Sequence, residues 1–157
     1  MSGAMKAVLQ RVSQAQVTVD GQVVGAIDQG FVILLGVEQG DSVKESSFLA
    51  QKITQLRIFS DQDGRMNNSI TDVGGKILVI SQFTLMADWK KGRRPGFSKA
   101  AAPKEANELY EHFCSELAGL GIGVEKGIFA AHMMVSLVND GPVTLILEHK
   151  EEPVPLS

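Results

Sequence analysis

Two short stretches of the chain carry groups that could do chemistry. The first is Ser81-Gln82-Phe83-Thr84, which places two hydroxyls, an amide and an aromatic ring where an apolar strand pattern ends. Such groups at a strand terminus can orient a small polar ligand. The plainer interpretation is a strand end whose Ser and Thr bond to nearby backbone. Strand alternation predicts Ser81 and Phe83 on one face and Gln82 and Thr84 on the other, unless a bulge rotates them.

The second stretch is Asn139-Asp140-Gly141-Pro142, which interrupts a long apolar, β-branched run. Pro142 has no backbone N–H, and Gly141 tolerates φ values that other residues avoid. The pair therefore either shapes a hairpin turn or presents a bare carbonyl group in a fixed direction. From spacing alone, a turn between strands at 132–139 and 143–149 is the simpler interpretation.

Familiar catalytic and metal-binding patterns are missing from the sequence. His112, His132 and His149 lack ligand spacing, and Cys114 has no second cysteine for a disulfide or a metal cluster. There is no nucleophile elbow, Walker loop or dinucleotide-binding glycine motif. We therefore expect no metal and no organic cofactor. A catalyst built from this chain would depend on backbone amides, hydroxyls and placement of the substrate.

A basic segment follows the first motif, between Trp89 and Phe97, and its glycines and prolines indicate a loop. Its cationic side chains are Lys90, Lys91, Arg93 and Arg94. Most basic runs are solvated surface. The neighbouring aromatic rings favour contacts with phosphates and bases, which makes the loop a candidate RNA-binding patch. The net charge of −3 argues against broad coating of nucleic acid but allows a local patch.

Hydrophobic periodicity predicts the strands that must position these groups. Residues 5–41 contain three or four antiparallel strands, with a tight hairpin turn at Asp20-Gly21. Two further strands, at 56–61 and 76–85, are separated by a polar loop at 62–75.

Two amphipathic helices complete the expected fold. One spans 42–56 with Asp41 or Ser42 as its N-cap, and the other spans 103–121 with Pro103 near its start. The apolar face of the first helix consists of Val43, Phe48, Leu49, Ile53 and Leu56. The predicted fold class is α+β, a single domain with antiparallel, barrel-like β-sheets and two main helices.

Length and composition fit one domain, because 157 residues can bury a sizeable core. No window reaches the roughly 18 apolar residues of a membrane span, and the single cysteine suits a reducing, cytoplasmic setting. Residues 1–4 look like a remnant of expression before a native start at Met5. The domain is then expected over 5–150, followed by a flexible tail at 151–157.

The sequence resembles the D-aminoacyl-tRNA deacylases, which hydrolyse D-amino acids from mischarged tRNA. SQFTL at 81–85 together with NDGPVT at 139–144 looks like the paired signature of that family. The segments at 5–21 and 92–101 also resemble it, so the likeness runs from Met5 to His149.

The resemblance implies a homodimer with active sites at the subunit interface. In the family the bond matching Gly141-Pro142 is cis and projects into the partner's active site, where its carbonyl groups occupy the place of an L side chain. Arg11 matches an arginine that holds this motif, although a solvent-facing strand charge is the alternative. Met133 matches a pocket-lining methionine, against plain core as the alternative. Asn139 is expected to support the same site.

By the same resemblance, Ser81, Gln82, Phe83 and Thr84 match the pocket for the terminal adenosine and its aminoacyl group. Thr84 could act as nucleophile, but no neighbouring base in the sequence would activate it. Water assisted by the ribose 2′-hydroxyl is therefore preferred, with backbone N–H groups stabilising the oxyanion. Glycyl-tRNA mischarged on tRNA-Ala could also be a substrate. Ala130 stands where a glycine is common in the family.

Two other functions are compatible with the same letters. One is an RNA 3′-end binding module that keeps the pocket without turnover. The other is a structural dimerisation domain without affinity for adenosine or tRNA.

Overall fold

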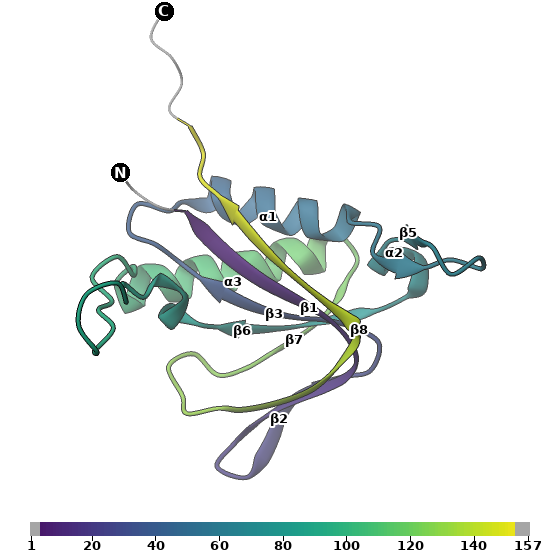
Figure 1. Ribbon diagram of the computed structural model, residues 1–157, viewed down its shortest axis with the longest axis horizontal. Coiled ribbons are helices and arrows are strands. Elements are labelled where there is room, and N and C mark those ends of the chain that lie inside the picture. The colour runs from purple at the N-terminus through teal and green to yellow at the C-terminus, as the bar shows by residue number, and fades with distance from the viewer. Residues whose placement is uncertain (1–3, 153–157) are drawn as a thin grey trace, which may run out of the picture.

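Residues 4–152 are described by the computed structural model, which forms a single α+β domain (Figure 1). Within that range a curled six-stranded sheet carries two long helices, and two short strands pair separately. The strands are β1 (Met5–Val19), β2 (Gln22–Ile27), β3 (Gly30–Gly36), β4 (Phe59–Ser60), β5 (Met66–Asn68), β6 (Lys76–Ser81), β7 (Gly123–Lys126) and β8 (Met134–His149). The helices are α1 (Val43–Gln55), α2 (Ile70–Val73), the 3-10 helix η1 (Phe83–Met86) and α3 (Pro103–Gly119). Most of the expected remnant at 1–4 and tail at 151–157 lies outside the described residues.

The sheet is mixed, so the prediction of antiparallel sheets is wrong. Its order is β2-β1-β3-β6-β7, and β8 pairs with the other edge of β1. The pairs β3–β6 and β6–β7 are parallel. The reason is that α1 and α3 lie in the crossovers that join these strands, and a crossover returns the chain to the same end of the sheet. The sheet curls into a nearly closed barrel, so that the strands at its two ends, β2 and β7, come close together. The backbone N–H of Ala26 in β2 donates to Glu125 Oε1 in β7 at 3.3 Å.

The strands predicted at 132–139 and 143–149 form the single strand β8. It pairs with β1 along almost its whole length, and the register shifts on either side of Val12. Gly141-Pro142 lies within that irregular stretch, where a residue without an N–H costs the ladder little. The interruption is thus a corner inside one strand rather than a turn between two.

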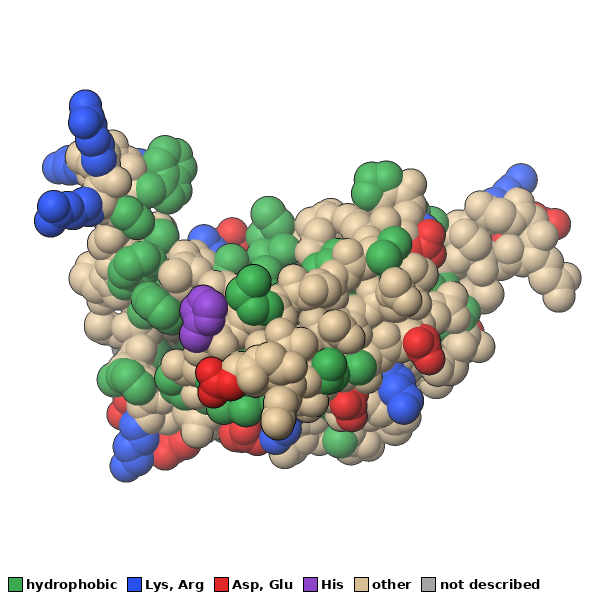
Figure 2. Space-filling view, turned by 90° about the horizontal axis from the view of Figure 1, so that it is seen from below, with side chains coloured by type: hydrophobic (Ala, Val, Ile, Leu, Met, Phe, Trp, Pro, Cys, Tyr) green, Lys and Arg blue, Asp and Glu red, His purple; other side chains and the backbone are tan. Residues whose placement is uncertain are grey.

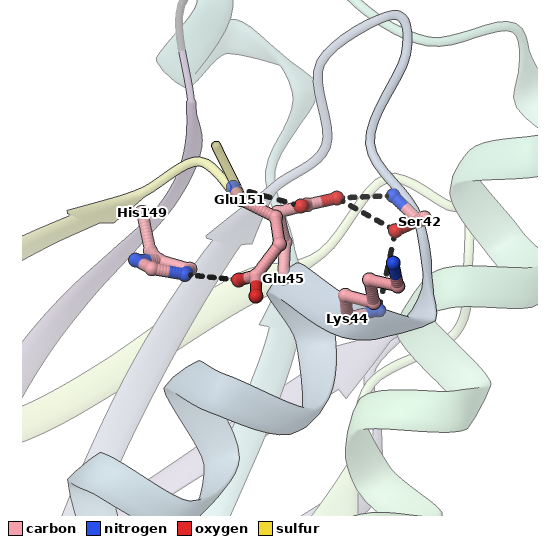
Figure 3. Close-up of polar contacts among 5 residues, drawn as sticks. All are labelled: Ser42, Lys44, Glu45, His149 and Glu151. Atoms are coloured by element: carbon pink, nitrogen blue, oxygen red, sulfur yellow. Dashed lines mark hydrogen bonds and ion pairs between the residues drawn. The ribbon is translucent and has the colours of Figure 1, made fainter. Parts of the chain in front are cut away.

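Local signals predicted the hairpin and the helices well. Asp20 and Gly21 both have positive φ, as a tight hairpin turn requires. The N-cap of α1 is Ser42, and Glu45 completes a capping box by accepting from the Ser42 backbone N–H at 2.6 Å (Figure 3). Helix α3 begins at Pro103, as expected.

Several predicted boundaries are wrong. The strand expected at 56–61 is reduced to β4, and the polar loop at 62–75 contains β5 and α2. Strand β7 was not predicted at all. On α1, Val43 and Phe48 are exposed, although Phe48 stacks on His149 with ring centroids 3.7 Å apart.

The core has two parts, one on each face of the sheet. The larger part packs α1 and α3 against the sheet, around Phe31, Leu49 and Phe113. The smaller part lies inside the curl, between Val17, Val32 and Leu78. No helix within residues 4–152 is long and apolar enough to cross a membrane.

Candidate active site

A cavity of about 620 Å³ opens where β6 ends. Val37, just after β3, and four other segments wall it, and they gather at the left of Figure 1. The four segments are the end of β6 with the start of η1, the segment from Phe97 to the start of α3, the loop from Phe129 to Met133, and the start of β8. A volume of this size is typical of a small-molecule site.

The strand predicted to run through the first motif ends at Ser81. The backbone N–H of Gln82 still donates to Leu35 O at 2.8 Å, and the chain then turns into η1. The expected strand alternation over 81–84 is therefore wrong. Ser81, Gln82 and Phe83 all line the cavity, whereas Thr84 does not.

Within residues 4–152, no carboxylate, imidazole or amine is hydrogen-bonded to the Thr84 hydroxyl. That hydroxyl accepts from Gln82 Nε2 at 2.6 Å. The backbone N–H groups of Phe83 and Thr84 open η1, and within residues 4–152 neither is recorded with an acceptor. The motif therefore offers free amide donors and a hydroxyl that is not activated.

Aromatic rings stand at the mouth of the cavity. Phe83 is 55% exposed, and its ring meets that of Phe97 edge-on, with centroids 5.0 Å apart and an interplanar angle of 71°. Sequence analysis did not place Phe97 or Phe129 in the pocket. The one local hint in the sequence was that each of these aromatic residues lies within two positions of a glycine. Alanines supply much of the remaining wall: Ala100, Ala101, Ala102, Ala106, Ala130 and Ala131.

Met133 lines the cavity and also packs against the inner core, so both interpretations of this residue describe part of its environment. A Cβ on Gly127 would lie 2.6 Å from Met133 Sδ, so a side chain there would require the thioether to shift. Ala130 has a φ of 65°, which is a left-handed conformation that favours glycine.

The Gly141-Pro142 bond is cis, and a buried arginine supports the corner. Arg11 is only 8% exposed; its Nε donates to Asp140 O at 3.0 Å, and its Nη1 donates to Ile58 O at 2.6 Å. The solvent-facing alternative for Arg11 is wrong. Gly141 has a φ of 131°, and a Cβ there would lie 2.8 Å from Arg11 Nη2.

Asn139 supports the corner from the other side. Its Oδ1 accepts from the Val143 N–H at 3.1 Å, and its Nδ2 donates to Thr144 Oγ1 at 3.1 Å. Gly141 and Pro142 themselves are exposed. The corner is therefore a fixed piece of main chain that faces solvent.

The corner lies far from the cavity of its own chain. Three strand spacings separate β8 from β6, and the corner sits level with Phe31 and Ile77, four residues short of Ser81. At ~4.8 Å per strand and ~3.3 Å per residue, the separation is roughly 20 Å. Figure 1 accordingly places the bend of β8 at the right and the cavity segments at the left.

The basic loop projects beside the cavity mouth. Asp88 and Gly96 pair through two backbone hydrogen bonds of 2.7 and 2.8 Å, which pin its base. Beyond them, Trp89 and the predicted patch of Lys90, Lys91, Arg93 and Arg94 are all exposed. Figure 2 shows Lys and Arg side chains gathered on a knob at that end of the molecule.

His132 is the histidine that lines the cavity, and the thiol of Cys114 lies outside its lining. Within residues 4–152, no three His, Cys, Asp or Glu side chains are placed to hold a metal ion. Burial raises the pKa of the Cys114 thiol to about 12, so it stays protonated at neutral pH.

Comparison with known proteins identifies a family. The family model described as D-Tyr-tRNA(Tyr) deacylase matches residues 8–148. The D-aminoacyl-tRNA deacylase of Geotalea uraniireducens is 59% identical over 92% of this chain and 93% of its own length. The protein of that name from Thermus aquaticus is 55% identical over 95% of this chain and 98% of its own.

Solved structures share the fold. The c-Myc DNA unwinding element binding protein matches with a TM-score of 0.85 at 38% identity, covering 95% of this chain and 99% of that one. A probable eukaryotic D-amino acid tRNA deacylase matches with a TM-score of 0.81 at 15% identity, covering 93% and 100%.

Proposed function

The chain belongs to the D-Tyr-tRNA(Tyr) deacylase family and deacylates D-aminoacyl-tRNA, and from this premise we propose how its site works and rejects the L form. The terminal adenosine and its aminoacyl ester occupy the cavity beside Ser81, Gln82 and Phe83. The L enantiomer is excluded by main-chain oxygens of the Gly141-Pro142 corner of a second copy of the chain.

The cavity suits the end of a charged tRNA. Its volume of about 620 Å³ has room for a nucleoside with an amino acid attached. The exposed rings of Phe83 and Phe97 at its mouth offer a face to adenine, since aromatic side chains stack on bases. The small alanine walls leave space for the aminoacyl side chain.

Hydrolysis proceeds by attack of water on the ester carbonyl, assisted by the ribose 2′-hydroxyl of the substrate. Water is preferred to Thr84 as the nucleophile because the Thr84 hydroxyl accepts a hydrogen bond from Gln82 Nε2, and within residues 4–152 no base is hydrogen-bonded to it. The free N–H groups of Phe83 and Thr84 stabilise the oxyanion, and one such donor is worth about 3 kcal/mol. An aminoacyl ester is reactive, so modest catalysis suffices.

The observation that carries the chirality proposal is the rigidity and position of the corner. Arg11 and Asn139 fix it by hydrogen bonds, and its exposed residues Gly141 and Pro142 lie roughly 20 Å from the cavity of the same chain, counted along the sheet. A fixed oxygen rejects a side chain by steric clash without binding the correct substrate tightly. For the corner to act in this way, it must enter the cavity of a neighbouring subunit.

Exposed apolar side chains on β8 support assembly of two copies. β8 pairs only with β1 among the described strands, and it carries exposed apolar side chains on both sides of its corner. They are Met134, Val138 and Ile146. Solvent-exposed apolar groups on a long edge strand favour contact with another chain. We propose a symmetric homodimer in which each corner completes the partner's site.

Glycyl-tRNA mischarged on tRNA-Ala is also a substrate under this proposal. Exclusion acts on the side chain of an L residue, and glycine has none. The corner therefore has nothing to reject.

One tRNA charged with D-tyrosine or with L-tyrosine tests the function. We expect rapid release of the D amino acid with the L ester left intact. Equal hydrolysis of both esters would contradict the chirality filter. Tight, salt-dependent binding of both without turnover would instead identify an RNA 3′-end binding module.

A further inference from the structure

Trp89 stands out on the basic loop. It is 70% exposed, and no other large apolar side chain in residues 4–152 is as exposed. Its ring contributes nothing to the core, and four cationic side chains follow it within six positions, with no acidic residue from Trp89 to Phe97. The segment is therefore a local concentration of positive charge in a chain whose net charge is −3.

The loop is attached to the mouth of the cavity. The paired backbones of Asp88 and Gly96 form its base, and Phe97 follows directly and contacts Phe83. A nucleic acid strand whose last nucleotide enters the cavity must leave past these two rings, beside the loop. The loop then meets the nucleotides immediately before the last one.

We propose that this loop binds the unpaired nucleotides that precede the terminal adenosine, with Trp89 stacked on a base and Arg93 and Arg94 on phosphates. The inference rests on the proposed function, which places the terminal adenosine in the cavity. The seven residues from Trp89 to Pro95 extend ~10 Å beyond the pinned base, at ~3.3 Å per residue on each leg. With a rise of ~3.4 Å per nucleotide, that reach covers about three nucleotides.

The chemistry of the loop favours a nucleic acid strand over other partners. Guanidinium groups match phosphate geometry, and an exposed indole ring stacks on any base. A loop that only attracted acidic surfaces would need no ring beside its charges. Trp89 is therefore the residue that distinguishes base contact from simple charge attraction.

The test compares Trp89→Ala with Trp89→Phe on two substrates that carry the same D-amino acid. One is full-length tRNA, and the other is a short ester on adenosine alone. We expect Trp89→Ala to lower kcat/KM on tRNA roughly 5- to 50-fold, the usual effect of losing one stacked base, and to leave the short ester unchanged. Trp89→Phe keeps a ring and should stay within about threefold of the wild type.

Charge is tested by the double variant Arg93→Ala/Arg94→Ala. Removing two single-strand phosphate contacts should reduce the slope of log(kcat/KM) on log salt by roughly 1.4 for tRNA. Arg65→Ala is the matched control, because Arg65 is exposed on the turn between β4 and β5 at the opposite end of the molecule (Figure 1). It should leave the slope unchanged.

Several results would overturn the inference. Equal loss on tRNA and on the short ester would mean that Trp89 acts through the cavity, and no loss on tRNA would remove the base contact. Loop-dependent binding to anionic lipid vesicles with unchanged tRNA kinetics would make the loop a membrane contact. A wild-type protein that hydrolyses neither ester would refute the proposed function itself.

Discussion

The cavity and the Gly141-Pro142 corner are built in opposite ways. Small and apolar side chains from several separate segments wall the cavity, and its protein hydrogen bonds are few. The corner is a few atoms of main chain held by hydrogen bonds from Arg11 and Asn139. Side chains that can adjust their positions suffice to bind a ligand. A main-chain oxygen that excludes a substrate by steric clash must instead be held in a fixed position. The comparison predicts that changes at the corner alter selectivity and changes at the cavity alter binding.

Replacing Arg11 with Ala should break the corner and have the largest effect. The carbonyl groups of Asp140 and Ile58 would lose their donors, so the free energy of unfolding should fall by about 2–4 kcal/mol. If the proposed exclusion by the corner holds, hydrolysis of the L ester should rise by roughly tenfold or more, because the excluding oxygen is then free to move. Urea unfolding and the ratio of D to L hydrolysis measure the two effects.

Arg11→Lys is the control for this prediction. A lysine keeps the charge but has one nitrogen, which cannot donate to both carbonyl groups in the geometry of a guanidinium. It should fall between Ala and the wild type. An Arg11→Ala variant with unchanged stability and selectivity would show that the corner does not need its support.

Replacing Phe83 with Ala should affect binding alone. Both esters carry the same adenosine, so loss of the exposed ring should raise KM for D-aminoacyl-tRNA by roughly 5- to 50-fold. The ratio of D to L hydrolysis should stay constant. A change in that ratio without a change in KM would contradict the prediction that the cavity determines binding and the corner determines selectivity.

The ionisation of Asp41 affects the stability of the segment next to Ala101 and Ala102 of the cavity wall. Asp41 Oδ2 accepts from the Glu38 N–H at 2.7 Å. Burial raises the pKa of Asp41 to about 6, the negative charges of Glu45 and Glu38 add to the shift, and Lys150 opposes it. The raised pKa means that the protonated form stabilises the fold below about pH 4, and that this stability is lost as the pH rises through 6.

Asp41→Asn keeps an acceptor oxygen without the charge. It should therefore raise the free energy of unfolding by about 1 kcal/mol at pH 7.5, after allowance for partial exposure, and by nothing near pH 4. Denaturant titrations across pH 4–8 measure the difference. A constant difference over that range would contradict the assigned cause.

Ala130→Gly should have the smallest effect. Relief of the left-handed conformation is worth about 1 kcal/mol, and the greater freedom of glycine in the unfolded chain offsets about half of it. The expected gain is at most ~0.5 kcal/mol in thermal or urea unfolding. Ala131→Gly, at a neighbour without positive φ, should instead lose ~0.5–1 kcal/mol. Equal behaviour of the two variants would argue against strain at Ala130.

Local sequence signals predicted most of the elements. Ser42, one of the two N-cap candidates, marks the start of α1, and Asp20-Gly21 identifies the first hairpin, because capping and turn chemistry act over a few residues. The parallel pairing of β3 with β6 depends on a crossover that joins distant segments. Strand patterns alone do not contain it, although the order strand, helix, strand points to it.

The candidate site divides in the same way. Ser81, Gln82 and Phe83 drew attention because they follow an apolar strand pattern, and the family resemblance of SQFTL assigned them to the pocket that they line. The opposing wall comes from the start of α3 and from Phe129, which no local pattern links to them. The burial of Arg11 also depends on tertiary structure, because its partner carbonyl groups lie 47 and 129 residues away along the chain.

The account depends on a corner that excludes the L ester from a neighbouring subunit. Val138→Asp and Ile146→Asp place charges at exposed apolar positions of β8, where a single chain tolerates them and a dimer interface would not. Sedimentation and the ratio of D to L hydrolysis should be measured on the same sample. We expect the wild type to sediment as a dimer and to spare the L ester, and a monomeric variant to lose that selectivity. A folded monomer that keeps full discrimination between the enantiomers would contradict the account.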